Sequence, residues 1–104
     1  MVVQNLAVEA GATIAVAKSL EAFIVDLNKG STDYLNAIGQ VHAAEYNLIP
    51  TDNTHLNVYG QALFGNMVSL LMNGIKAACF EEWTTPNATI AKAIQEGLFI
   101  LPAV

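Results

Sequence analysis

Apolar residues recur every three to four positions in several stretches of the chain, and this spacing predicts helices. The first expected helix covers residues 2–20, where one face carries Val3, Leu6, Ala10, Ile14 and Ala17. Gly11 lies inside this pattern, and glycine costs a helix about 1 kcal/mol relative to alanine. Two shorter helices on either side of Gly11 are therefore an alternative to one long helix.

The next stretch, AFIVDL at residues 22–27, is continuously apolar and contains β-branched residues. Apolar runs without alternation are typical of strands that are buried on both faces of a parallel sheet. Such a strand needs neighbours on both edges, because its backbone groups must be hydrogen-bonded. The expected fold class is α/β, a helix-rich part of a three-layer α/β/α sandwich. The rest of the sheet would come from a larger domain or from another copy.

Turn and capping residues place three further helices. After a turn at residues 28–30, Ser31 or Thr32 is expected to cap a helix that ends near Gly39. The next helix is expected after the N-cap residue Asn57 and ends at Gly74. A last short helix has Pro86 at or near its first position and Gly97 as its stop, and an apolar tail, LFILPAV, closes the chain.

Composition narrows the class of protein. Hydrophobic residues make up 54% and charged residues 12% of the 104 residues, against roughly 45–50% and about 25% in ordinary soluble domains. This balance argues against disorder and predicts exposed apolar surface, so self-association or pairing with missing sheet strands is expected. The net charge is −5, and the four basic residues are scattered lysines. A nucleic-acid partner is not expected, because binding phosphates requires clustered cations.

Targeting, membrane and metal signals are weak. The first twenty residues lack a basic leader and contain Glu9 and Lys18 within their apolar run, so neither a signal peptide nor a membrane span is expected. The single cysteine, Cys79, cannot form an internal disulfide and is expected in the core. No second histidine or cysteine lies at ligand spacing to support a metal site, and no cofactor is expected.

The stretch TDNTHLNVYGQALFG at residues 51–65 places an aspartate and a histidine three residues apart, just before a helix. A histidine that acts as a general base needs a carboxylate on its other ring nitrogen, which fixes the tautomer. The spacing of Asp52 and His55 allows this contact. The alternative is structural: Asp52 forms an Asx turn, and His55 is a solvated loop residue.

The block DNTHLNVYGQALFGNMVSLL resembles the last block of the SGNH (GDSL-type) esterases, where an Asp-x-x-His turn precedes a glycine and an apolar helix. The segments FIVDLNKGSTDYLNAIG and AEYNLIPTDNTHLN are similar to those before this block in fungal carbohydrate acetylesterases of the rhamnogalacturonan type. The resemblance is clearest over residues 22–73. It implies that residues 1–74 are the C-terminal part of an SGNH-like, flavodoxin-like domain. Residues 75–104 are expected to be a helical tail.

The same resemblance implies an activity and a substrate. His55 would be the catalytic base, Asp52 would orient it, and the substrate would be an acetyl ester, for example on an acetylated carbohydrate. Family members are commonly secreted, whereas no export signal is recognised here. Two features depart from the family. Leu56 stands where many members have proline. This sequence also lacks the Gly-Asp-Ser block, which supplies the serine, and the Gly-x-Asn-Asp block, which contributes to the oxyanion hole. The alternative function is therefore a catalytically inactive remnant that self-associates or binds another protein.

Three other residues carry side chains suited to chemistry or binding. Ser31 is a possible substitute nucleophile, but as a helix cap it needs nothing beyond the expected helix. His42 is expected to be a solvated surface residue near the end of a helix. Trp83 is expected to pack against the main body, with a binding surface as the alternative.

Overall fold

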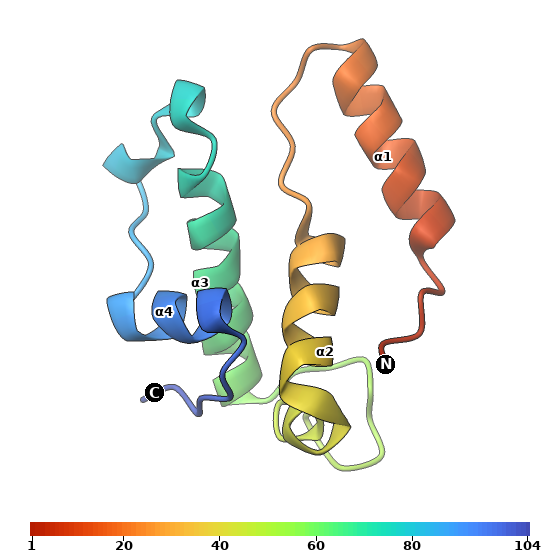
Figure 1. The fold of residues 1–104 in the computed structure, drawn as a ribbon, viewed down its shortest axis with the longest axis vertical. Coiled ribbons are helices and arrows are strands. Elements are labelled where there is room, and N and C mark those ends of the chain that lie inside the picture. Colours follow the sequence, from red (N-terminus) through yellow and green to blue (C-terminus); the bar gives the residue numbers. More distant parts are fainter.

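The computed structural model covers residues 1–104 and is built from helices joined by irregular segments (Figure 1). The four α-helices are α1 (Ala7–Ser19), α2 (Leu27–Ala44), α3 (Val58–Asn73) and α4 (Ala88–Glu96). Two short 3₁₀ turns, η1 (Lys76–Ala78) and η2 (Phe80–Glu82), lie between α3 and α4. The four helices expected from the sequence are confirmed in number and order, and Gly11 lies inside the single continuous α1.

The expected α/β sandwich is wrong, because the structure contains no strand and no sheet. Residues 22–26 of the AFIVDL stretch form the connection between α1 and α2, and Leu27 is already the first residue of α2. The physical reason is local. The Asp26 carboxylate accepts the backbone N–H of Lys29 at 2.9 Å, which starts a helix where the sheet interpretation places a strand. Ile24 and Val25 are only half-buried, and Phe23 is exposed.

Helix α2 therefore begins at Leu27, before the expected cap at Ser31 or Thr32. Residues 28–30, which were predicted to form a turn between elements, belong to the helix. Ser31 is not the cap; its hydroxyl donates to the carbonyl of Asn28 at 3.2 Å. The helix is kinked at Gly39, which has a φ of 81°. This positive φ favours glycine, because a side chain would clash with the backbone there. The predicted end near Gly39 therefore coincides with a break between two helical segments.

The N-termini of α3 and α4 are capped by asparagines. The Asn57 side chain accepts the N–H groups of Tyr59 and Gly60, each at 3.0 Å, as expected from the sequence. Asn87 caps α4 in the same way, and Pro86 directly precedes this cap, near the predicted first position of the helix. Gly97 ends α4 in the left-handed conformation, with a φ of 65°, which confirms the predicted stop.

The small core lies where α2, α3 and α4 meet (Figure 1). Its buried members are Tyr34, Ile38, Tyr46, Leu63, Met67 and Ile90. The apolar tail after α4 closes this core, since Phe99 and Ile100 pack against it. Only 11 of the 104 residues are buried, so most apolar side chains keep contact with solvent.

Two buried tyrosines join the tail to the core. The Tyr46 hydroxyl donates to the carbonyl of Ile100 at 2.6 Å, and the Tyr34 hydroxyl lies 3.0 Å from both the Leu98 carbonyl and the Tyr46 hydroxyl. The two hydroxyl groups supply two protons for these three contacts, so Tyr34 divides its single proton between two acceptors. Burial raises the pKa of both tyrosines.

Helix α1 lies apart from this core, on the other side of α2 from α3 and α4 (Figure 1). None of its residues is buried. The residues before it are held to α2, because the Val2 N–H donates to the Asn36 side chain at 2.6 Å and the Gln4 amide donates to Thr32 at 2.8 Å. The structure contains no helix with both the length and the apolar character needed to cross a membrane.

Candidate functional site

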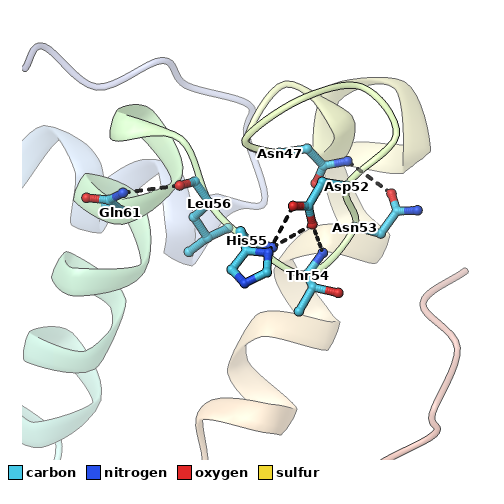
Figure 2. Close-up of polar contacts among 7 residues, drawn as sticks. All are labelled: Asn47, Asp52, Asn53, Thr54, His55, Leu56 and Gln61. Carbon is cyan, nitrogen blue, oxygen red and sulfur yellow. Dashed lines mark hydrogen bonds and ion pairs between the residues drawn. The ribbon is translucent and has the colours of Figure 1, made fainter.

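Asp52 and His55 lie in a loop that connects α2 to α3 and is closed at its base by backbone hydrogen bonds (Figure 2). The Leu48 N–H donates to the His55 carbonyl at 2.8 Å, and the Asn57 N–H donates to the Tyr46 carbonyl at 3.0 Å. These bonds form an isolated antiparallel bridge between Asn47 and Leu56. The loop is thereby fixed to the buried residue Tyr46 on one side and to the start of α3 on the other.

The start of α3 holds the loop in a second way. Besides capping the helix, the Asn57 side chain donates to the Glu45 carbonyl at 2.7 Å, so one residue fixes both ends of the connection. Gly60 lies so close to the incoming chain that an added Cβ would be 2.8 Å from the Tyr46 carbonyl oxygen. The glycine of the TDNTHLNVYG stretch is therefore required by a close backbone approach.

The Asp52 carboxylate makes three hydrogen bonds within the loop (Figure 2). Its Oδ1 atom accepts the backbone N–H groups of Thr54 at 2.8 Å and His55 at 2.9 Å. Its Oδ2 atom lies 2.9 Å from Nδ1 of the His55 ring. The two interpretations of the sequence are thus compatible, because one oxygen forms the Asx turn and the other contacts the imidazole.

These contacts determine the protonation of the pair. The two backbone N–H groups, together with the His55 ring, lower the pKa of Asp52 from 3.8 to about 2. Asp52 is therefore a carboxylate at neutral pH and can only accept a hydrogen bond. Consequently Nδ1 of His55 must be the donor, and in the neutral ring Nε2 carries the lone pair.

The ring is accessible. The His55 side chain is 71% exposed, whereas that of Asp52 is 23% exposed. No hydrogen bond involves Nε2, and Figure 2 shows the imidazole projecting from the loop. A free, oriented Nε2 beside a fixed carboxylate is the arrangement that proton abstraction by histidine requires.

None of the three serines of this chain completes a triad with His55. The Ser19 hydroxyl donates to the Val16 carbonyl, and the Ser31 hydroxyl donates to the Asn28 carbonyl. The Ser69 hydroxyl pairs with that of Thr84 at 2.8 Å. Ser31 also lies in the opening turns of α2, while the loop with His55 follows the other end of that helix. The structure does not bring together Ser31 and His55.

Other candidate residues lie outside this loop. His42 is exposed, as expected, and its ring stacks on Phe99 with a centroid distance of 4.3 Å. Cys79 and Trp83 are not packed in the core, which corrects both expectations: Cys79 is exposed with a φ of 52°, and Trp83 is 85% exposed. No group of three or more His, Cys, Asp or Glu side chains is arranged to hold a metal ion.

A groove of about 780 Å³ borders the loop on the side of the N-terminal segment. Asn47, Pro50 and Asn53 of the loop line it, together with residues of α2 such as Asn36 and with Met1–Val3. His55 does not line this groove. The groove is therefore separate from the accessible face of the imidazole.

Sequence reasoning missed two supports of the site. The Asn47 side chain donates to the Asn53 side chain at 3.0 Å, which braces the loop across its width. The steric role of Gly60 follows only from the approach of the Tyr46 carbonyl, although the glycine itself was visible in the motif. Pairs of asparagines in a loop give no signal of mutual contact, because each can also form a local turn.

Comparison of the chain with protein-family models, with curated proteins and with solved structures yields no match.

Proposed function

We propose that Asp52 and His55 are the orienting carboxylate and the general base of a serine ester hydrolase of the SGNH type. The observation that supports this most directly is the 2.9 Å contact between Asp52 Oδ2 and His55 Nδ1, with Nε2 free and exposed. In this proposal the residues come from the C-terminal part of the enzyme. The nucleophilic serine and the oxyanion hole lie outside residues 1–104.

The chemistry assigned to the pair is proton transfer. Nε2 of His55 takes the proton of a serine hydroxyl while the hydroxyl oxygen bonds to the ester carbonyl carbon. The imidazolium that forms is stabilised by the Asp52 carboxylate. The same proton then passes to the alcohol oxygen as the bond between the acyl carbon and that oxygen breaks. Water removes the acyl group in a second round of the same steps.

The substrate class comes from the resemblance alone. Acetyl esters of carbohydrates are the proposed substrates, because residues 22–73 resemble carbohydrate acetylesterases. A small acetyl ester is therefore the appropriate probe for the chain in isolation.

Hydrolysis of 4-nitrophenyl acetate tests the proposal with a matched control. The chain has two histidines, and both are exposed. The isolated chain holds no serine against His55, so any rate above the buffer background comes from Nε2 of His55 acting directly on this activated ester or on water. The variant His55→Ala is expected to lose that rate, whereas His42→Ala retains it, because only His55 has a carboxylate on Nδ1. Equal rates for the wild type and His55→Ala would overturn the proposal.

The second candidate function is that of a catalytically inactive protein that self-associates or binds another protein. It is favoured by the serine hydroxyls, all of which are bonded away from His55, and by the exposed apolar side chains. Pairing of sheet edges, the mode of association that the sequence predicts, is wrong because the chain has no strand. Helix surfaces would have to mediate any such contact.

A further inference from the structure

The chain exposes more surface than a monomer of its size usually does. Its accessible surface is 7022 Å², whereas a folded monomer of 11.1 kDa is expected to expose about 5,700 Å². The surplus of about 1,300 Å² exceeds the roughly 800 Å² that each partner buries in a stable interface of standard size. The area available for association is therefore sufficient for a dimer.

Exposed large hydrophobic residues are most frequent at the N-terminal end of the chain. Of the seventeen large hydrophobic residues that are exposed, eight lie within residues 1–27, which are only a quarter of the sequence. Those on α1 and at its two ends are Leu6, Val8, Val16 and Leu20. Several large apolar side chains exposed on one element are typical of an interaction site.

Helix α1 has two apolar stripes on opposite sides. The inner stripe consists of Ala10, Ile14 and Ala17, the helix residues that are half-buried. Ala10 and Ile14 line a small groove together with residues 24–28 of the same chain. The outer stripe consists of Val8, Ala12 and Ala15, all of which are exposed. At about 100° per residue, the centres of the two stripes lie roughly half a turn apart.

The two charged residues of α1 lie on the edges between these stripes. Glu9 and Lys18 are nine positions apart, which places them on opposite sides of the helix at about 100° per residue. Both charges can therefore stay in water while the two stripes are covered. A helix that is apolar on both broad faces is typically buried on both. Here the chain itself covers only the inner stripe.

We propose that the outer stripe of α1 is the centre of a homodimer interface, in which it packs on the same stripe of a second copy. A twofold axis makes such a contact self-complementary, because the same patch serves both partners. The central alanines allow the two helix axes to approach closely, and the exposed Val16, which neighbours the stripe on the side of Glu9, extends the contact. This interface does not depend on the chemistry of His55.

A second copy fits this face better than a lipid surface does. Helices that lie on membranes are rich in lysine and arginine on their polar side, which attracts anionic lipids. Helix α1 has one lysine and one glutamate, and the chain has a net charge of −5. The outer stripe also has no charge that a partner of opposite charge would recognise.

Sedimentation equilibrium of the full chain tests the interface. The wild type is expected to approach twice the 11.1 kDa chain mass as its concentration rises, over a range of about 1 to 100 μM. The variant Val8→Lys places a charge in the apolar contact and is expected to raise the dissociation constant at least about tenfold. Val41→Lys is the matched control, since Val8 and Val41 are helical valines with exposures of 82% and 80%.

Circular dichroism distinguishes dissociation from unfolding, because both variants should retain the helix content of the wild type. Three results would overturn the interface: a wild type that stays monomeric throughout, equal effects of the two substitutions, or a larger effect of Val41→Lys. A monomeric wild type that hydrolyses the acetyl ester would refute the dimer alone. A dimer without that activity would refute only the catalytic proposal.

Discussion

Nδ1 of His55 lies 2.9 Å from Oδ2 of Asp52, and the backbone N–H of His55 donates to Oδ1 of the same carboxylate. One aspartate therefore fixes both the main chain and the ring of the histidine three residues later. The main-chain bond fixes the backbone of His55 relative to Asp52, and the second carboxylate oxygen orients the ring. This is why a four-residue stretch in a loop can hold an oriented imidazole in a chain with so small a core.

The pKa of Asp52 provides a first test of this arrangement. It is lowered from 3.8 to about 2, chiefly by the backbone N–H groups of His55 and Thr54. A lowered pKa stabilises the fold above the unfolded value of 3.8, and this contribution is lost as the pH falls toward about 2. A carbon-13 NMR titration of the carboxyl group should find the lowered pKa.

In the variant His55→Ala the pKa of Asp52 should rise only in part, because alanine keeps the backbone N–H. The value is expected to remain below 3.8. A complete return to 3.8 would mean that the imidazole alone stabilises the carboxylate, contrary to the Asx turn seen here.

Gly60 provides a test of how the loop is held. A Cβ at this position would lie 2.8 Å from the Tyr46 carbonyl oxygen, a backbone atom whose hydrogen bond to Asn57 would have to shift. Gly60→Ala is therefore expected to lower the free energy of unfolding by about 1–3 kcal/mol in urea denaturation. The control is Gly65→Ala in the same helix, where the added methyl meets no atom within 4 Å.

Gly65→Ala should instead raise the free energy of unfolding by about 0.5–1 kcal/mol, because alanine restricts the unfolded chain and favours helix. If both alanine variants were stabilised, the close approach of α3 to Tyr46 would not exist in solution.

The buried tyrosine pair predicts a loss of stability at alkaline pH. Burial raises the pKa of Tyr34 above its usual value of 10.0, so the folded state keeps the hydroxyl neutral. The resulting stabilisation is complete below pH 10 and declines as the pH rises above it, because the unfolded state loses the proton first. Urea denaturation between about pH 8 and 12 should show this decline.

Tyr34→Phe should reduce the decline in stability above pH 10, whereas Tyr59→Phe, at an exposed tyrosine, serves as the matched control. Absorbance at alkaline pH gives a second readout, since the buried phenols should ionise together with unfolding. Ionisation of Tyr34 in a chain that stays folded would contradict the buried pair.

Helix positions were predictable because their signals are local. Asn57 as a cap and Gly97 as a stop each act within one helical turn, and both are confirmed. The contact between Asp52 and His55 is local too, and it is present, although its catalytic role stays a prediction. The strand at residues 22–27 was wrong because a continuous apolar run fits a buried strand and a half-buried connection equally well. The capping signal of Asp26 distinguishes the two.

Burial was harder to predict than helix position. Cys79 and Trp83 were expected to be packed because of their residue types, yet both are exposed. Conversely, Tyr34 and Tyr46 gave no signal of their contact, which depends on carbonyl groups more than fifty residues later in the chain. Such contacts depend on how distant segments meet, and local patterns do not encode this.

The tautomer of His55 tests the central claim most directly. Nitrogen-15 NMR of the neutral ring distinguishes a proton on Nδ1 from one on Nε2. The wild type is expected to carry the proton on Nδ1, donated to the Asp52 carboxylate, with Nε2 free to act as a base. The variant Asp52→Asn should shift the population toward the Nε2–H form. A wild-type ring with its proton on Nε2 would contradict the account, because a histidine in that form cannot accept the proton of a nucleophile at Nε2.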